Sequence, residues 1–195
     1  MIIDAHKREQ IMPLPVAVIS TVSKDGVNNL APWSCISPIL RPLEEVMLAS
    51  WIKRDTLNNI RDTGEFVINI PSVDMLKEVM ICAKLFPPEV DEFQKAGLKP
   101  QKSVKVKAPG IEGCLARGEC VLVEEISREK YSLIIGKVVH LEVRDDCFDQ
   151  SGDMDIGKAK PLVAVIGEKG TWFTSPGSEG IYFEHKQMSL RRDEK

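Results

Sequence analysis

The sequence predicts a mainly β protein in which a barrel carries a few short helical excursions. Many segments of strand length are rich in β-branched residues, whereas only two or three short segments show helical periodicity. Strand and helix do not alternate strictly, and neither a G-x-G-x-x-G motif nor a Walker A loop is present. These observations argue against a Rossmann domain and against a P-loop nucleotide-binding domain.

The N-terminal part of the chain predicts a β-hairpin. Residues 6–11 are expected to form a short helix, and residues 16–23 are a strand candidate because β-branched side chains dominate them. The Asp-Gly pair at 25–26 accepts the positive φ of a tight turn, so residues 27–34 are expected to return as the second strand. Residues 46–52 are the next strand candidate.

A helix and a strand follow this hairpin region. Residues 55–63 place apolar side chains on one helical face, with Asp55 or Thr56 as the expected N-terminal cap and Gly64 as the stop. Residues 66–70 are a strand candidate and are closed by a proline.

A second helix and a long irregular excursion come next. Apolar side chains recur at helical spacing over residues 73–83. Prolines and a glycine break residues 86–106, where only a short turn at 91–96 is expected, and such long loops tend to be functional. Residues 152–160 are expected to form a polar surface loop. The remaining strand candidates are residues 116–126, 131–143, 162–166, 171–173 and 181–183.

Composition excludes several classes of protein. The 195 residues include 26 basic and 29 acidic side chains, a formal net charge of −3, and 43% hydrophobic residues. A disordered chain would need lower hydrophobicity, and a dedicated nucleic-acid binder would carry a basic excess. A signal peptide and a bilayer-spanning apolar run are both missing, so we expect a cytoplasmic protein without nucleic-acid or membrane partners.

Neither a metal site nor a disulfide framework is expected. The five cysteines are odd in number and form no C-x-x-C pair. The three histidines form no H-x-x-x-H spacing, and no G-x-S-x-G motif occurs. No residue is therefore assigned as a metal ligand or a catalytic nucleophile.

The first candidate motif is a pair of cations directly before the predicted helix at 55–63. Lys53 and Arg54 add positive charge where a helix N-terminus leaves backbone N–H groups unpaired. Arg54 has the geometry to hold a phosphate through two parallel bonds, and the Thr56 hydroxyl adds a donor. The alternative is an ordinary capped helix preceded by solvated basic residues, and spacing alone favours that alternative.

Two further motifs are weaker when taken singly. In residues 28–34, small side chains and Pro32 let a flat ligand approach the backbone, whose N–H and C=O groups pair with a heteroaromatic edge. The alternative is a strand end with Trp33 in the core. Residues 82–93 join a helix end to a rigid, proline-rich loop, and the alternative there is a structural connector with inward-packed aromatic residues.

Taken together and in this order, the three motifs resemble the flavin reductase-like family, with its FMN-binding split barrel, and within it the flavoredoxin-type branch. The matching segments are residues 13–21, 25–26, 29–34, 54–60, 64–69, 86–88, 91–93 and 96–98. The resemblance implies a single domain over residues 1–195, with a core at about 10–166 and a C-terminal extension at 167–195. It also implies a six-stranded antiparallel barrel of Greek-key type that binds FMN at a homodimer interface, and it favours the phosphate clamp over the plain capped helix.

The resemblance also implies which residues contact FMN. The second motif would line the isoalloxazine ring, the first would hold the ribityl phosphate, and the end of the second helix would close over the flavin. The implied cofactor-binding residues are Asn29, Leu30, Ala31, Pro32, Trp33, Ser34, Ser50, Trp51, Lys53, Arg54, Asp55, Thr56, Asn59, Cys82, Ala83 and Lys84. The chain departs from the family at Trp33, where Tyr or Phe is common, and at Cys82, where Ser or Thr is common.

By the same resemblance, the expected function is that of an FMN-dependent oxidoreductase. NAD(P)H would reduce the bound FMN, and electrons would pass to free flavin, iron or a redox partner protein. Because a flavin carries hydride and electrons itself, no side chain is expected to act as a proton-transfer catalyst. Two alternatives stay open: a non-enzymatic electron carrier that holds FMN, and a flavin-free or flavin-sensing interaction module.

Overall fold

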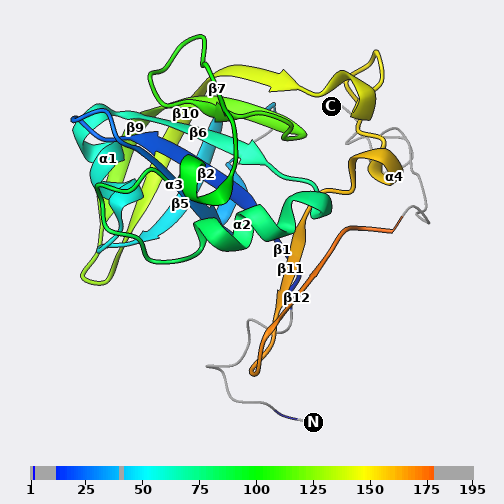
Figure 1. Ribbon diagram of the computed structural model, residues 1–195, viewed down its shortest axis with the longest axis horizontal. Coiled ribbons are helices and arrows are strands. Elements are labelled where there is room, and N and C mark those ends of the chain that lie inside the picture. The colour runs from blue at the N-terminus through cyan, green and yellow to red at the C-terminus, as the bar shows by residue number, and fades with distance from the viewer. Residues whose placement is uncertain (1, 3–11, 40–41, 178–195) are drawn as a thin grey trace, which may run out of the picture.

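The computed structural model describes residues 2, 12–39 and 42–177, and it is built around one antiparallel sheet (Figure 1). Seven strands pair in the order β3-β2-β6-β9-β10-β5-β4. Their bounds are β2 Ala17–Val22, β3 Asn28–Trp33, β4 Ile36–Pro38, β5 Glu45–Trp51, β6 Glu65–Ile70, β9 Ala116–Ser127 and β10 Tyr131–Val143. The six longer strands are those predicted, within one residue at either end. The seventh, β4, is only three residues long and has no periodicity to reveal it.

The order of the strands is that of a Greek key. β6, β9 and β10 lie side by side, and β5, which precedes β6 in the chain, lies beside β10 instead of β6. The two edge strands, β3 and β4, are joined only by Ser34 and Cys35. This short link keeps the two ends of the sheet close together, so the sheet curls into a barrel with one open seam.

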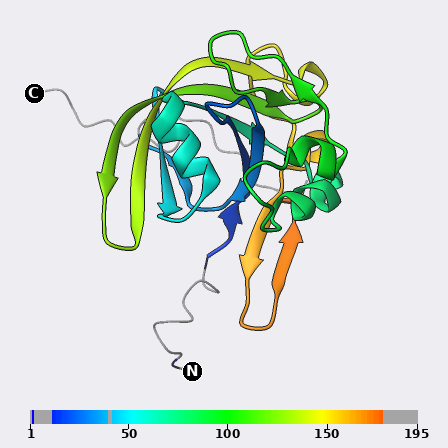
Figure 2. The ribbon, with the colours of Figure 1, turned by 60° about the vertical axis from the view of Figure 1, so that its left-hand side comes forward.

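Helix α1, Asp55–Thr63, packs on the inner face of the curled sheet (Figure 2). Leu57 and Ile60 are fully buried beside Phe66 and Ile134, which confirms the predicted apolar face of the helix. The inner core is therefore made by one helix and both halves of the sheet.

The expected cap of α1 is wrong, whereas its expected stop is confirmed. The N-cap is Arg54, whose side chain makes no cap hydrogen bond, and Asp55 is already the first helical residue. The helix ends at Gly64, which has φ 72° and donates its N–H to the Ile60 carbonyl. Glycine adopts this left-handed conformation without the steric cost of a Cβ atom.

The excursion between β6 and β9 covers the outer face of β2 and β3. It comprises the 3₁₀ turn Val73–Met75, the helices α2 Leu76–Cys82 and α3 Glu92–Ala96, and the two-residue strands β7 Pro100–Gln101 and β8 Gly110–Ile111. Both helices pack on β3, with Leu30, Val79 and Phe93 in a common outer core. The helix predicted over 73–83 is confirmed except for its 3₁₀ first turn, and the expected turn at 91–96 is the helix α3.

A second sheet joins the two ends of the described chain. β1 Leu14–Pro15, β11 Val163–Ile166 and β12 Thr171–Thr174 pair in the order β1-β11-β12, and the β11–β12 hairpin (orange) extends away from the barrel (Figures 1 and 2). The surface loop expected over 152–160 is partly wrong, because it contains the single-turn helix α4 Ile156–Ala159, capped by Asp155. The helix expected at 6–11 and the strand expected at 181–183 lie outside the described residues.

All five cysteines are free thiols. Among the described residues, no three His, Cys, Asp or Glu side chains form a group that could hold a metal ion. In the same part of the chain, no helix has both the length and the apolar character needed to cross a membrane.

Candidate functional site

One cavity of about 380 Å³ brings the three sequence motifs together. It lies between β3, the end of β5, the start of α1 and the segment that follows α2. The lining residues are Asn29, Leu30, Ala31, Pro32, Trp33, Ser34, Cys35, Ala49, Trp51, Lys53, Arg54, Asp55, Thr56, Cys82, Ala83, Lys84, Leu85, Phe86 and Glu92. Every predicted site residue except Ser50 and Asn59 is among them.

The start of α1 forms the cationic end of the cavity. The helical ladder begins with the bond from the Asn58 N–H to the Arg54 carbonyl at 3.1 Å, so the N–H groups before Asn58 lie outside it. The side chains of Lys53 and Arg54 are exposed here, and within the described residues neither forms an ion pair. Backbone donors, helix dipole and two cations thus coincide at one point.

The outer edge of β3 forms a second wall of the cavity. The Leu30 N–H points away from β2, because it donates to Glu92 Oε2 at 3.2 Å. The backbone N–H and C=O groups of successive residues in an antiparallel strand point alternately to its two sides. Pro32, two residues after Leu30, therefore also directs its backbone carbonyl to the open edge of β3. Proline lacks an N–H, which suits it to an unpaired strand edge. This edge therefore presents carbonyl groups and small side chains to the cavity.

The side chain of Asn29 links two of the motifs. Its Oδ1 accepts the Thr56 hydroxyl at 2.9 Å and the Thr21 hydroxyl at 3.3 Å, and its Nδ2 donates to Glu92 Oε1 at 3.1 Å. The amide orientation follows from these partners, because a carboxylate accepts and a hydroxyl donates. In this arrangement the Thr56 hydroxyl proton is directed at Asn29.

Glu92 is a buried acid in the cavity wall. It is only 4% exposed, and its two oxygens accept the side-chain and backbone donors of Asn29 and Leu30. Burial raises the pKa of this carboxyl, although the two donors oppose the shift. Glu92 therefore ties the excursion to the strand edge that it covers.

Cys82 lines the cavity as an unreactive thiol. It is 3% exposed, and burial raises its pKa to about 12, with the nearby Glu92 carboxylate adding to the shift. A thiol with this pKa stays protonated at neutral pH and is a poor nucleophile. Its contribution to the wall is that of a small, weakly polar side chain.

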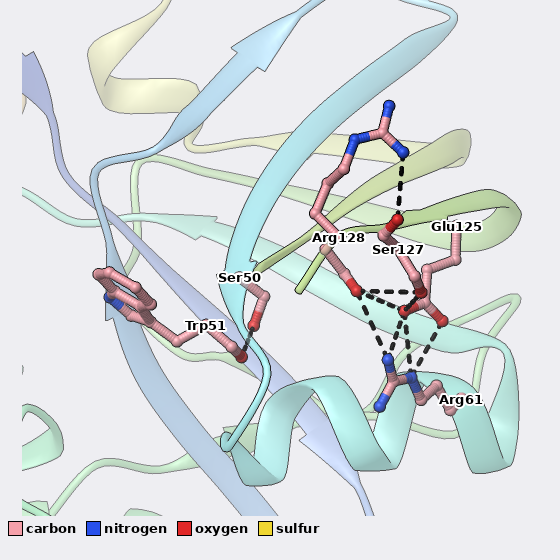
Figure 3. A network of polar contacts seen from close by, with 7 residues as sticks. Ser50, Trp51, Arg61, Glu125, Ser127 and Arg128 are labelled. Carbon is pink, nitrogen blue, oxygen red and sulfur yellow. Dashed lines mark hydrogen bonds and ion pairs between the residues drawn. The ribbon is translucent and has the colours of Figure 1, made fainter. Parts of the chain in front are cut away.

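Two predicted residues lie outside the cavity wall. Ser50 is 1% exposed, and its hydroxyl donates to the Trp51 carbonyl at 2.9 Å (Figure 3). Successive side chains on a strand face opposite sides, so Trp51 reaches the cavity and Ser50 does not. Asn59 lies one step behind the wall, because its Nδ2 donates to the Thr21 hydroxyl at 3.0 Å.

A polar network fastens α1 to the β9–β10 hairpin (Figure 3). Arg61, in the last turn of α1, donates through Nε to Glu125 Oε2 at 3.0 Å, and Ser132 donates to the same carboxylate at 2.6 Å. The Arg61 guanidinium holds the pKa of Glu125 at about 2, well below its ordinary value. The network fixes the direction of the helix whose other end borders the cavity.

The cavity has five lining residues that were not among the predicted cofactor-binding residues. These are Cys35, Ala49, Leu85, Phe86 and Glu92. Ala49 lies two residues before Trp51 on β5, so strand alternation is a signal that identifies it. The remaining four follow or belong to the predicted segments, but their orientation depends on how the excursion folds back on β3.

Comparison with known proteins agrees with this fold. The sequence matches the family described as "Flavin reductase like domain" over residues 8–165. A protein of Methanothermobacter thermautotrophicus is 51% identical over 178 residues, which are 89% of this chain and 84% of that protein. Nitrilotriacetate monooxygenase component B from Bacillus cereus is similar in structure, with a TM-score of 0.80 at 27% identity over 88% of each chain. Flavoredoxin of Desulfovibrio vulgaris (Miyazaki F) has a TM-score of 0.84 at 20% identity, over 97% of this chain and 100% of that one.

These matches confirm the predicted split-barrel fold and the resemblance drawn from the three motifs. The family match covers most of the chain, and a relative shares half of its residues over most of its length. The chain therefore belongs to the flavin reductase-like family.

Proposed function

We propose that this chain is a flavoprotein oxidoreductase that binds FMN in the cavity and takes electrons from NAD(P)H. The observation that supports this best is the meeting of a cationic helix start and an open strand edge in one cavity. The cavity volume of about 380 Å³ lies in the range of roughly 300–1,000 Å³ that small-molecule sites occupy.

The helix start fits a phosphate. Lys53 and Arg54 carry full charges and are unpaired within the described residues, and backbone N–H groups outside the helical ladder lie beside them. Asp55 lies at the same end of the cavity and offsets part of this charge. For Thr56, the backbone N–H is the better donor, because its hydroxyl already donates to Asn29.

The strand edge fits a flat heteroaromatic ring. Ala31, Pro32 and Ser34 are small enough for close approach, and the carbonyl groups of the unpaired edge accept ring N–H groups. When bound, FMN supplies the hydride and electron chemistry, and the protein supplies position and access. The residues of this chain therefore bind and orient the cofactor.

FMN rather than FAD is the flavin that we propose for this cavity. A single cationic helix start suits one phosphate group, whereas FAD adds a second phosphate and an adenosine. The cavity offers one such start, at Lys53 and Arg54.

A homodimer is the working unit that we propose. Trp51 is 64% exposed and Leu85 is 85% exposed, and both line the cavity. Large apolar side chains at the mouth of a site favour cover by a second protein surface. A molar mass twice that of the chain, measured by light scattering, supports the dimer, and a monomer at micromolar concentration contradicts it.

An anaerobic flavin titration tests the proposed function. Purified protein is loaded with FMN, excess flavin is removed, and bound flavin is measured by absorbance and fluorescence quenching. NADH or NADPH is then added, and we expect the flavin absorbance to bleach at a catalytic rate.

Each outcome selects one function. Protein that binds no flavin contradicts both the oxidoreductase and the electron carrier. Flavin that binds but is reduced only by a ferredoxin-like protein identifies a non-enzymatic electron carrier. Bleaching by NAD(P)H, with electrons passed to free flavin or iron, supports the oxidoreductase.

A further inference from the structure

We propose that the lysine segment, residues 95–107, is a docking surface for an acidic electron-donor protein, which would reduce the bound flavin as a second source of electrons beside NAD(P)H; this inference rests on the proposed flavin function. Between Phe93 and Ile111 there are five lysines and no acidic residue, although the whole chain has a net charge of −3. The lysines are Lys95, Lys99, Lys102, Lys105 and Lys107, and all five are exposed. Positive charge is therefore concentrated in one stretch of a chain that is acidic on balance.

The lysine segment is held in a defined conformation by a buried carboxylate. Glu119 on β9 is 4% exposed and accepts the N–H groups of residues 104–106 at 2.8, 2.5 and 3.2 Å. A loop of merely solvated lysines does not need a buried acid to shape its backbone. A preorganised loop loses less conformational freedom when a partner binds to it.

Two acids that accept backbone N–H groups of the lysine segment do not pair with its lysine side chains. Both carboxylate oxygens of Glu119 accept backbone N–H groups of residues 104–106. Glu65 accepts the backbone N–H of Lys107 at 2.7 Å. Within the described residues, no lysine of the segment forms an ion pair. The ammonium groups are therefore available to a partner.

The lysine segment borders the candidate flavin site. Asn28 lies in a shallow groove together with residues 102–107, and the next residue, Asn29, lines the cavity. Because successive side chains of a strand face opposite sides, the link between groove and cavity runs through the residues at the start of α3. The Asn28 side chain also donates to Asp91 at 3.0 Å, directly before the cavity residue Glu92. A partner on the lysine segment thus lies beside the cavity.

The chemistry of the lysine segment favours an acidic protein over a small phosphate ligand. It contains five lysines and no arginine, spread along an exposed stretch, whereas phosphate sites combine arginine forks with converging N–H groups. Dispersed lysines accelerate the encounter with an oppositely charged protein surface. Two molecules of a one-electron carrier would each lose one electron, and the bound flavin would gain two electrons and take its proton from water.

The test compares two triple variants with the same change of charge. Lys102→Gln, Lys105→Gln and Lys107→Gln remove charge from the lysine segment, and Lys130→Gln, Lys137→Gln and Lys169→Gln remove it from exposed positions elsewhere. The probe is a strongly acidic [2Fe–2S] ferredoxin. Its binding to the full chain is measured by thermophoresis with and without FMN, and the reduction of FMN-loaded protein by reduced ferredoxin is followed by stopped flow at several salt concentrations.

We expect the segment variant to bind the ferredoxin more weakly than wild type and to be reduced 10- to 100-fold more slowly at low salt. Its rate of reduction should also depend less on salt. The control should stay within about twofold of wild type in both measurements. Equal behaviour of the two variants overturns the docking surface, even if FMN binds normally. The docking surface is also overturned if the segment variant binds NADPH or anionic lipid vesicles more weakly than wild type does but binds ferredoxin equally well. Because ferredoxin binding is measured without FMN as well, failure of the flavin function is recognised separately.

Discussion

Asn29 and Glu92, which lie 63 positions apart in the chain, form a hydrogen bond of 3.1 Å from Nδ2 to Oε1 in the wall of the cavity. The same Asn29 side chain accepts the Thr56 hydroxyl at 2.9 Å. One amide therefore joins the excursion, the strand edge and the helix start. The three sequence motifs meet through this contact, which explains how segments so far apart act as one site.

Removing the carboxylate of Glu92 should destabilise the fold. In Glu92→Gln, one acceptor becomes an N–H₂ donor that faces the donors of Asn29 and Leu30. A buried donor without a partner costs about 1–3 kcal/mol, so we expect a clearly lower urea midpoint. The matched control is Glu89→Gln, at an exposed position of the same segment. Equal midpoints for the two variants would show that the Glu92 contacts contribute nothing to stability.

Removing the Arg54 guanidinium should weaken the binding of FMN, because contacts with its phosphate group are lost. Arg54→Ala loses charge-assisted hydrogen bonds at the helix start, so we expect a roughly 10- to 100-fold higher Kd for FMN. Riboflavin, which lacks the phosphate, should bind with unchanged affinity in a fluorescence titration. Arg128→Ala is the control, because Arg128 is exposed on the β9–β10 turn. An equal loss for FMN and riboflavin would contradict the phosphate assignment.

Gly136 on β10 should not tolerate a methyl group. A Cβ atom there overlaps the ring of the fully buried Phe66, with Cε1 only 2.7 Å away. Overpacking of this kind costs about 1–3 kcal/mol, so Gly136→Ala should lower the melting temperature. Gly118→Ala on the neighbouring strand is the control, since its Cβ meets Val138 at an ordinary 3.9 Å. A melting temperature for Gly136→Ala that matches the control would be inconsistent with this packing.

The Arg61–Glu125 pair should make stability depend on pH in the acid range. The folded-state pKa of Glu125 is about 2, against an ordinary 4.5, so the carboxylate stabilises the fold above pH 4.5 and this contribution is lost as pH falls towards 2. The pair is partly exposed, so its contribution is about 0.5–1 kcal/mol.

Urea unfolding at pH 7, 4.5 and 3 measures this contribution. Glu125→Gln should be less stable than wild type at pH 7, and the difference should shrink at pH 3. Glu124→Gln, at an exposed position of the same strand, should show no such change. A difference that stays constant with pH would rule out the pair as its source.

The amino-acid sequence alone predicts the longer strands and the order of the motifs. β-branched runs, the Asp-Gly turn at 25–26 and the stop at Gly64 are local signals, because they depend on backbone sterics and side-chain alternation. For this reason the six longer strands were predicted within one residue at either end, whereas the short β4 and the single-turn helix α4 were not. Most of the cavity lining also follows from the motifs.

Which side chains complete the site depends on how the strands and helices pack against one another. Ser50 belongs to a predicted segment, yet strand alternation turns it away from the cavity that Trp51 lines. Glu92 was part of a motif, but its role in the wall arises because α3 packs on β3 and buries the carboxylate against unpaired N–H groups. A buried acid is stable only where donors from another segment meet it. That meeting of donors and acid is a property of the packed fold and not of local spacing.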